Sequence, residues 1–335
     1  MKLHGTAPMR ADLAGGTLDI YPLYVFLGGA MTLNTAIALT SEVWLETTGG
    51  TGIKIISEDL GEEVSAPDAA SLDPAKGLDL LARIVRFYNP ETGCEIRTKN
   101  NVPKGSGLGA SSSLLICLSH VMNELTGRRF SAEKIIDIGA NLEAQTIRIP
   151  TGKQDYYSAT YGGVSTIWFD VDGGRREPLI SDEGFIKELE ERLVITFAGK
   201  PRFSGLSNWN MTKAYIDGEP RTVRNFEQIK KTAMEMRECF RGGDLEGFGR
   251  LLGVEWENRK GLAEGVTNER IDAMMEAAAG AGAVSSKICG AGGGGCMVSF
   301  CGAGAKAAVS KALTAAGADV LDCGISREGV KVEKM

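Results

Sequence analysis

Residues 103–113 read Pro-Lys-Gly-Ser-Gly-Leu-Gly-Ala-Ser-Ser-Ser, and an apolar segment with helical character follows directly. Glycines at positions 105, 107 and 109 allow the backbone to turn its N–H groups toward a bound anion. The N-terminus of the following helix adds about half a positive charge at the same point. The three successive hydroxyls at 111–113 can bond phosphate oxygens or a Mg²⁺ ion. The stretch therefore indicates a loop that holds the phosphates of a nucleotide.

Other interpretations of this loop have less support. The string Gly105-x-Gly107-x-x-Ala110 matches a dinucleotide-binding pattern, but that pattern needs an acidic residue at the end of a second strand about 20 positions further on. Here that distance falls near Glu124, within the same predicted helix. The Walker A pattern GxxxxGK followed by Ser or Thr does not occur in the sequence. A purely structural glycine turn with a serine helix cap stays open on this stretch alone.

Two more glycine-rich segments lie toward the ends of the chain. The string GAGGGG at 290–295 follows Lys287 and precedes an apolar strand. Four successive glycines cost conformational entropy on folding, which favours close packing of the backbone against a ligand phosphate or another loop. Near the N-terminus, PMRADLAGGTLD at 8–19 places a cation, a glycine turn and a carboxylate close together.

A fourth segment, Gly-Lys-Gln-Asp at 152–155, follows a predicted helix that carries Glu143. A kinase needs a group near the attacking hydroxyl, a metal ligand and a cation over the transferring phosphoryl group. Asp155, Glu143 and Arg10 are residues of these types. Each of them alone could equally be a solvated surface charge, so the argument depends on the four segments together.

The composition limits the class of protein. The 335 residues suffice for two domains of about 150 residues each, and the net charge of −6 comes with no run of Lys and Arg, so we expect no nucleic-acid partner. The seven cysteines form no CxxC pair, which indicates reduced thiols rather than a zinc site. We find neither a signal peptide nor an apolar stretch of about 20 residues, and we expect a cytoplasmic protein without a membrane partner.

Hydrophobic periodicity predicts interspersed strands and helices, and therefore an α+β fold in two domains. The predicted strands are 30–47, 53–57, 94–100, 164–170, 193–198, 285–289, 296–301 and 328–333. The predicted helices are 73–88, 111–125, 131–148, 221–241, 244–260, 268–280 and 304–316. The charged region 173–190 is the expected domain boundary.

In order and spacing, segments 8–19, 103–113, 152–155 and 287–295 resemble the motifs of the GHMP kinases, the family of galactokinase, homoserine kinase, mevalonate kinase and phosphomevalonate kinase. The resemblance extends over nearly the whole chain. It implies a kinase that uses ATP and Mg²⁺, with an N-terminal ribosomal-protein-like domain (residues 1–180) that binds ATP and a C-terminal ferredoxin-like domain (residues 190–335). It also implies that the substrate lies in the cleft between the domains.

The same resemblance implies roles for individual residues. Asp155 matches the catalytic aspartate of the family, Arg10 its charge-stabilising cation, and Ser111 and Glu143 its magnesium ligands. The expected ATP-binding residues are Pro103, Gly105, Ser106, Gly107, Leu108, Gly109, Ala110, Ser111, Ser112 and Ser113. The expected substrate-binding residues are Gly16, Thr17, Asp19, Gly152, Gln154, Arg202, Gly292 and Gly293.

The first motif narrows the substrate class. Galactokinases carry Glu and His where this chain has Gly16 and Thr17, and the form AGGTxD is similar to the heptose-7-phosphate kinase and fucose kinase branch. We therefore expect a sugar or sugar phosphate as acceptor, with the anomeric hydroxyl as one candidate, and Lys200 and Arg202 could clamp a substrate phosphate. A mevalonate-type kinase or decarboxylase, and a nucleotide-binding protein without activity, are the alternatives. The exact sugar, the hydroxyl used and a homodimeric state are left open.

Overall fold

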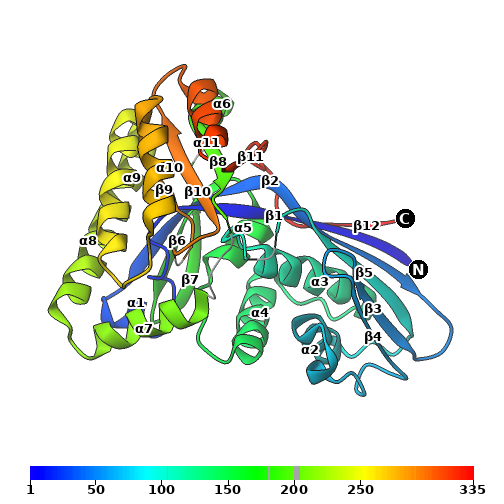
Figure 1. Cartoon of the computed structure of the whole chain (residues 1–335). Coiled ribbons are helices and arrows are strands. Elements are labelled where there is room, and N and C mark those ends of the chain that lie inside the picture. The colour runs from blue at the N-terminus through cyan, green and yellow to red at the C-terminus, as the bar shows by residue number, and fades with distance from the viewer. Residues whose placement is uncertain (104, 180–181, 200–203, 291) are drawn as a thin grey trace.

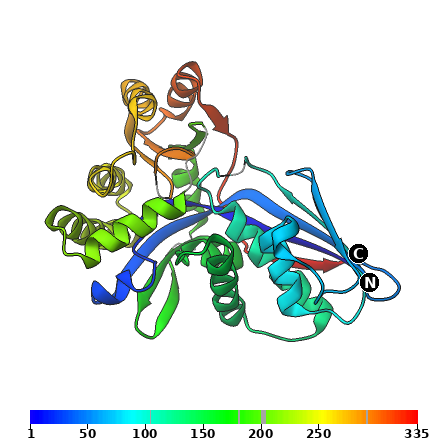
Figure 2. The same cartoon turned by 60° about the horizontal axis from the view of Figure 1, so that its bottom comes forward.

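The computed structural model describes residues 1–103, 105–179, 182–199, 204–290 and 292–335, and for 204–207 it describes the backbone only. These residues form two β-sheets with helices packed against them, which confirms the predicted α+β class. The two termini lie at the same end of the molecule, where the first and last strands pair (Figures 1 and 2).

In the described part of the chain, the larger sheet has eight strands in the order β12-β1-β2-β5-β3-β4, with β6 and β7 continuing from β2. The 18-residue strand β2 pairs with β5 through residues 41–47 and with β6 through residues 30–35, so it joins the two parts of the sheet. The strands are β1 (Lys2–Ala14), β2 (Ala30–Thr47), β3 (Ile53–Ser57), β4 (Glu62–Ala66), β5 (Cys94–Asn100), β6 (Val164–Asp170), β7 (Gly173–Pro178) and β12 (Lys331–Lys334).

Helices α2 to α5 pack below this sheet in the view of Figure 1. Their boundaries follow local chemistry: the Ser131 hydroxyl accepts a hydrogen bond from the Lys134 amide at the start of α4, and α3 ends at Gly127 in the left-handed conformation. The helices before residue 165 are α1 (Leu23–Phe26), the 3-10 helix η1 (Pro74–Lys76), α2 (Asp79–Tyr88), α3 (Ala110–Thr126), α4 (Ala132–Ile147) and α5 (Gln154–Tyr161).

The second sheet has the order β11-β8-β10-β9, and all its neighbours are antiparallel. Its strands are β8 (Leu193–Phe197), β9 (Ala283–Ile288), β10 (Cys296–Cys301) and β11 (Asp319–Leu321). Helices α8 and α9 pack against each other beside it (Figure 1). The helices are α6 (Glu183–Arg192), α7 (Ser204–Ile216), α8 (Pro220–Gly242), α9 (Leu245–Lys260), α10 (Glu269–Gly280) and α11 (Lys306–Ala315).

Strand β1 changes the face that it presents to the helices partway along its length. At its start, Gly5 lies against Val121 of α3. A register shift between β1 and β2 follows at Pro8/Met9, and beyond it Met9 packs in an apolar cluster with Phe248 of α9. Because side chains alternate along a strand, the residue after Met9 then points to the side where α5 lies. In this way β1 places the charged side chain of Arg10 in the interior.

The predicted strand 30–47 and the predicted helices 111–125, 131–148 and 221–241 are confirmed to within two residues at each end. The prediction of one continuous helix over 73–88 is wrong, because Gly77, at φ +119°, separates η1 from α2. The charged region expected as a boundary holds β7 and most of α6. The division of the chain into two domains at 180–190 stays a prediction. Strand β12, from the C-terminal end of the chain, pairs with β1 in the first sheet.

The contact between β1 and α3 can be tested by enlarging Gly5. A Cβ atom there would lie 2.5 Å from the Val121 Cγ2 atom and 3.0 Å from the Cys117 sulfur, so Gly5→Val should overpack this contact and lower the free energy of unfolding by about 1–3 kcal/mol. Denaturant unfolding measures the change, with Thr6→Val, on the neighbouring half-buried position, as the control. Equal stability of both variants would contradict the close approach of α3.

Candidate active site

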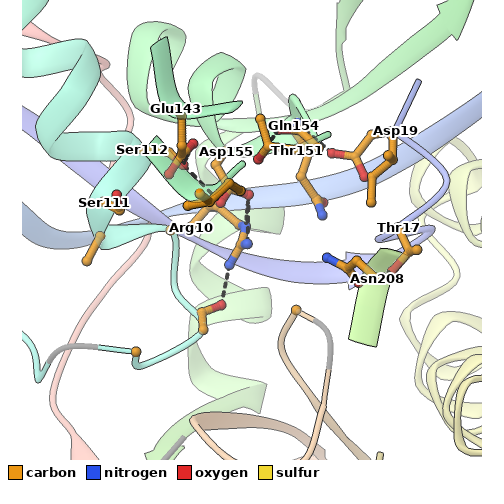
Figure 3. A pocket seen from close by; sticks show the side chains of 18 of the residues that line it. Arg10, Thr17, Asp19, Ser111, Ser112, Glu143, Thr151, Gln154, Asp155 and Asn208 are labelled. Atoms are coloured by element: carbon orange, nitrogen blue, oxygen red, sulfur yellow. Dashed lines mark hydrogen bonds and ion pairs between the residues drawn. The ribbon is translucent and has the colours of Figure 1, made fainter. Parts of the chain in front are cut away.

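A cavity of about 280 Å³ lies between the end of β1, the glycine-rich loop before α3, and the start of α5. Figure 3 shows its two ends: Arg10, Asp155 and Glu143 gather at one, and Asp19, Thr17 and Asn208 lie at the other. The remaining lining residues are Ile20, Gly105, Ser106, Gly107, Gly109, Ala110, Ser111, Ser112, Ile147, Pro150, Thr151, Gly152, Gln154 and Gly290. The four segments singled out in the sequence therefore meet around one space.

The loop before α3 requires glycine for both conformation and space. Gly105, Gly107 and Gly109 have φ values of +76°, +74° and +74°, a region that other residues rarely adopt. A Cβ atom on Gly107 would lie 2.8 Å from the Cys289 carbonyl oxygen, and one on Gly109 would lie 2.9 Å from an Asp155 carboxylate oxygen. The loop is thus pressed between the second glycine-rich segment and α5, with its end at the N-terminus of α3.

Arg10 connects β1 to this loop and to α5. Its Nε donates to the Asp155 Oδ1 atom at 2.7 Å, its Nη2 lies 2.7 Å from the same oxygen, and its Nη1 donates to the Gly107 carbonyl (Figure 3). Arg10 is 5% exposed. Burial disfavours its charged form, but the negative charges of Asp155 and Asp12 outweigh this and raise the pKa of Arg10. The guanidinium therefore stays charged at the edge of the cavity.

Glu143 on α4 is buried beside Asp155. It accepts a hydrogen bond from the Ser112 hydroxyl at 3.1 Å and another from the Tyr156 hydroxyl. The Ser112 oxygen also lies 3.4 Å from the Asp155 Oδ2 atom. Burial raises the pKa of Glu143, and the hydrogen bond from Tyr156 opposes that shift in part. Ser111, the serine expected to bind magnesium, is exposed and lines the cavity.

These oxygen donors fit Mg²⁺. Mg²⁺ is usually held by one or two carboxylates together with substrate phosphates and water. Glu143 and Asp155 provide two carboxylates, and Ser111 and Ser112 provide hydroxyls, all on the cavity wall. Among the described residues there is no group of three or more His, Cys, Asp or Glu side chains that could hold a metal without such help.

The opposite end of the cavity is lined by two residues that carry buried hydrogen-bond acceptors without a partner. Asp19 is 1% exposed, and its Oδ2 atom accepts from the Gln154 backbone amide at 2.8 Å. Among the described residues, neither the Asp19 Oδ1 atom nor the Gln154 Oε1 atom has a hydrogen-bond partner, although both are buried. Burial raises the pKa of Asp19 to about 6. Unpaired buried acceptors are costly, so this arrangement calls for a ligand that brings N–H or O–H donors.

Thr17 at this end has a strained backbone. Its φ is +74°, which is unfavourable for a β-branched residue, and its hydroxyl donates to the Asn208 Oδ1 atom at 3.2 Å. Glycine would relieve this strain, so the threonine side chain at the cavity wall has a local cost. Sequence analysis did not identify Asn208, because its neighbours in the sequence carry no motif.

Several other residues expected in the site lie elsewhere. Pro103 is exposed outside the cavity, and the buried Ser113 hydroxyl donates to the Ala7 carbonyl at 2.9 Å. Leu108 belongs to the apolar core, Gly16 packs on the carboxylate of Asp12, and Gly292 and Gly293 pack on Val266. Lys200 and Arg202 lie outside the described residues.

A second cavity of about 320 Å³ adjoins the first and shares Gly105, Ala110 and Ser111 with it. Leucines of α2 and α3 form much of its wall, and Asp59 and Asn100 supply polar groups. A mainly apolar pocket with a few polar groups, next to a glycine-rich loop at a helix N-terminus, has the character of a pocket for the nucleoside part of a nucleotide. In the described residues no helix is long and apolar enough to span a membrane.

Comparison with known proteins connects this geometry to a family. The model described as GHMP kinases N terminal domain matches residues 77–163, and the one described as GHMP kinases C terminal matches residues 236–319. The chain is 29% identical over 332 residues to a D-glycero-alpha-D-manno-heptose 7-phosphate kinase from Campylobacter jejuni, covering 97% of this chain and 96% of the relative.

Two further comparisons define how broad this similarity is. A mevalonate kinase from Thermococcus gammatolerans is 25% identical, over 100% of this chain and 99% of its own. The crystal structure of a D-glycero-D-manno-heptose 1-phosphate kinase from Bacteriodes thetaiotaomicron superposes with a TM-score of 0.81 at 24% identity, covering 99% of both chains.

The raised pKa of the buried Asp19 carboxylate leads to a prediction about the stability of the protein at different pH values. Its folded-state pKa is about 6, above the ordinary 3.8, so its contribution to stability is fully present below about pH 4 and is lost as the pH rises through about 6. Asp19→Asn lacks this pH dependence. Its free energy of unfolding, relative to that of the original protein, should therefore be higher at pH 8 than at pH 4 by on the order of 2 kcal/mol. Unfolding at several pH values measures this, with the exposed Asp137→Asn as control. A stability difference between Asp19→Asn and the original protein that does not change with pH would contradict the prediction.

Proposed function

The chain belongs to the GHMP kinase family, and we propose that within it this protein transfers the γ-phosphoryl group of MgATP to a hydroxyl of a sugar or sugar phosphate. The observation that carries the substrate class is the pair of unpaired buried acceptors, Asp19 Oδ1 and Gln154 Oε1, at the end of the cavity opposite Arg10. A polyol supplies a donor for each of them.

The same acceptors count against a substrate that places an anionic group beside Asp19, as mevalonate does if its carboxylate binds at this end; a sugar phosphate fits with its hydroxyls at this end and its phosphate away from it. A carboxylate placed beside Asp19 would meet a like charge in a buried setting, which is unfavourable by several kcal/mol unless a cation intervenes. Among the described lining residues the cation is Arg10, and it is already paired with Asp155. The identity to the heptose 7-phosphate kinase, over nearly the full length of both chains, supports a phosphorylated sugar in particular.

The nucleotide fits the other side of the cavity. The backbone of 105–109 and the N-terminus of α3 form an anion-binding cradle, and the adjoining cavity has room for a nucleoside. ATP bound there would supply the phosphoryl group, and Mg²⁺ would reduce the repulsion between that group and an incoming oxygen. Glu143 and the hydroxyls of Ser111 and Ser112 are the residues that would hold the metal, which leaves Asp155 for the acceptor hydroxyl.

Asp155 has the geometry of a group that orients and deprotonates the acceptor hydroxyl. Arg10 occupies its Oδ1 atom, which leaves Oδ2 toward Ser112 and the cavity. The proton of the hydroxyl passes to this carboxylate as the oxygen bonds to phosphorus and the bond to the leaving oxygen of ADP breaks. Arg10 holds the carboxylate in place and offsets the negative charge that develops beside it.

A substrate panel tests the proposed function. With MgATP, free sugars, sugar phosphates and mevalonate are compared by the rate of ADP formation and by mass spectrometry of the products. We expect phosphorylation of a sugar or heptose phosphate with kcat/KM at least about 10³ times that for mevalonate, because several hydroxyl contacts are lost with mevalonate. Preferential phosphorylation of mevalonate would overturn the substrate class.

Replacement of Asp155 tests the mechanism. Asp155→Ala should lower kcat by about 10²–10⁴ without loss of the fold, because the acceptor hydroxyl loses its orienting group and proton acceptor. The exposed carboxylate of Asp137, which pairs with Lys153 on the neighbouring surface, provides the control variant Asp137→Ala with near-normal kcat. Near-normal turnover of folded Asp155→Ala would remove this residue from the chemical step.

A further inference from the structure

Four fully buried charged side chains form a cluster next to the active site, and the mechanism does not use them directly. Asp12 lies on β1, Glu255 and Arg259 lie on α9, and Lys287 lies on β9, and all four side chains are 0% exposed. The Lys287 Nζ atom lies 3.3 Å from Asp12 Oδ1 and 3.3 Å from Glu255 Oε2, and the Arg259 Nε atom donates to Glu255 Oε1 at 3.0 Å. Two negative and two positive charges balance.

The cluster joins the two sheets of the protein. Asp12 belongs to the large sheet, whereas Lys287 belongs to the four-stranded sheet and Glu255 and Arg259 to a helix packed beside it. Burial opposes the charge on Asp12, but Lys287, Arg259 and Arg10 together lower the pKa of this carboxyl, so it is ionised. The ion pairs therefore act across the boundary between the two parts of the chain.

From this cluster Arg259 reaches both loops that close the cavity on this side. Its Nη2 atom donates to the Gly16 carbonyl at 2.9 Å, and its Nη1 atom lies 3.5 Å from the Gly290 carbonyl. Gly16 is followed by the strained Thr17, and Gly290 itself lines the cavity. A Cβ atom on Gly16 would lie 2.3 Å from the Asp12 Oδ2 atom, so the turn rests directly on the cluster.

Stability alone is a poor reason for such a cluster. Taking four charges out of water is costly, and well-packed apolar side chains of similar volume often stabilise a core as well or better. A guanidinium with five fixed donors can, however, hold two carbonyls and a carboxylate in a defined geometry, which an apolar group cannot. The contacts at Gly16 and Gly290 are of this kind.

We propose that Asp12, Glu255, Arg259 and Lys287 form a positioning cluster that fixes the 15–19 turn and the loop at Gly290 relative to each other and thereby sets the affinity for the sugar substrate. The inference rests on the proposed function for its substrate, but the geometry it describes exists without one. Among the described residues, no side chain of the cluster bonds the loop at 105–109 or Glu143. The Gly290 loop packs on Gly107, so the cluster acts on nucleotide binding only through this packing, and its effect there should be smaller than on sugar binding.

The test compares Arg259→Lys, which keeps the charge but loses the planar fork, with Asp12→Asn, which removes one charge at almost constant shape. Val309→Ala, in the core of α11, is a control that lowers stability away from both loops. We expect both cluster variants to raise the KM for the preferred sugar about tenfold or more, because small misplacements of binding groups have large effects. The KM for ATP should stay within about twofold, and Val309→Ala should change neither value.

Hydrogen exchange provides a readout without substrate. Backbone amides of 15–20 and 289–295 should exchange faster in both cluster variants than in Val309→Ala, when the variants are compared at the same loss of melting temperature. If the original protein phosphorylates no sugar, the proposed function fails while exchange still decides the positioning role. If the changes in amide exchange and in the KM for the sugar depend only on how far the melting temperature falls, whichever residue is replaced, the cluster is merely structural and the inference is wrong. If Arg259→Lys does not fold, Asp12→Asn decides the question.

Discussion

The buried ion pair between Arg10 and Asp155 is the contact on which the active-site geometry depends. Arg10 also donates to the Gly107 carbonyl, and its backbone amide donates to the Leu108 carbonyl at 3.0 Å. One residue of β1 thus fixes both the glycine-rich loop at 105–109 and the first turn of α5. Because the pair is mostly withdrawn from water, its attraction is stronger than that of a surface ion pair, and loss of either partner would leave an uncompensated charge.

Charge near the cavity is balanced locally rather than by the net charge of the protein. The chain carries a net charge of −6, yet phosphate groups are expected to bind where glycine amides and a helix N-terminus point at them. Arg10, Arg259 and Lys287 are each paired with carboxylates. Under the proposed function the phosphates would therefore be held mainly by backbone groups and metal, while the paired cations fix the positions of the cavity walls.

The sequence predicted much of the fold because several elements carry strong local signals. Strand β2 was located from its run of β-branched and apolar residues, the start of α4 from the Ser131 cap, and the end of α3 from Gly127. Strand β1 was not predicted, because Pro8 and charged residues interrupt its alternation, and its burial results from helices on both sides that the local sequence does not reveal. Helix α5 was missed because its eight residues are too few for periodicity to emerge.

The motifs in the sequence identified the segments that meet around the cavity, but not which residue of each segment faces it. Ser111, Ser112 and Ser113 look alike in the sequence, yet one is exposed on the cavity wall, one bonds Glu143 and one bonds the Ala7 carbonyl in the core. The 3.6-residue period of α3 separates them, and only the position of the neighbouring strand decides which faces the cavity. Asn208 and Tyr156 gave no signal because their partners are distant in sequence.

Three features that cost folding energy lie around this one cavity. Thr17 holds an unfavourable φ, burial raises the pKa of Asp19 to about 6, and the cluster of Asp12 and its partners takes charge out of water. Apolar residues or glycine would relieve each of these costs. A fold selected for stability alone would not place all three within a few residues of β1. A site that must present fixed acceptors to a polyol needs this arrangement, because the same groups bind well only when they are held in place before the ligand arrives.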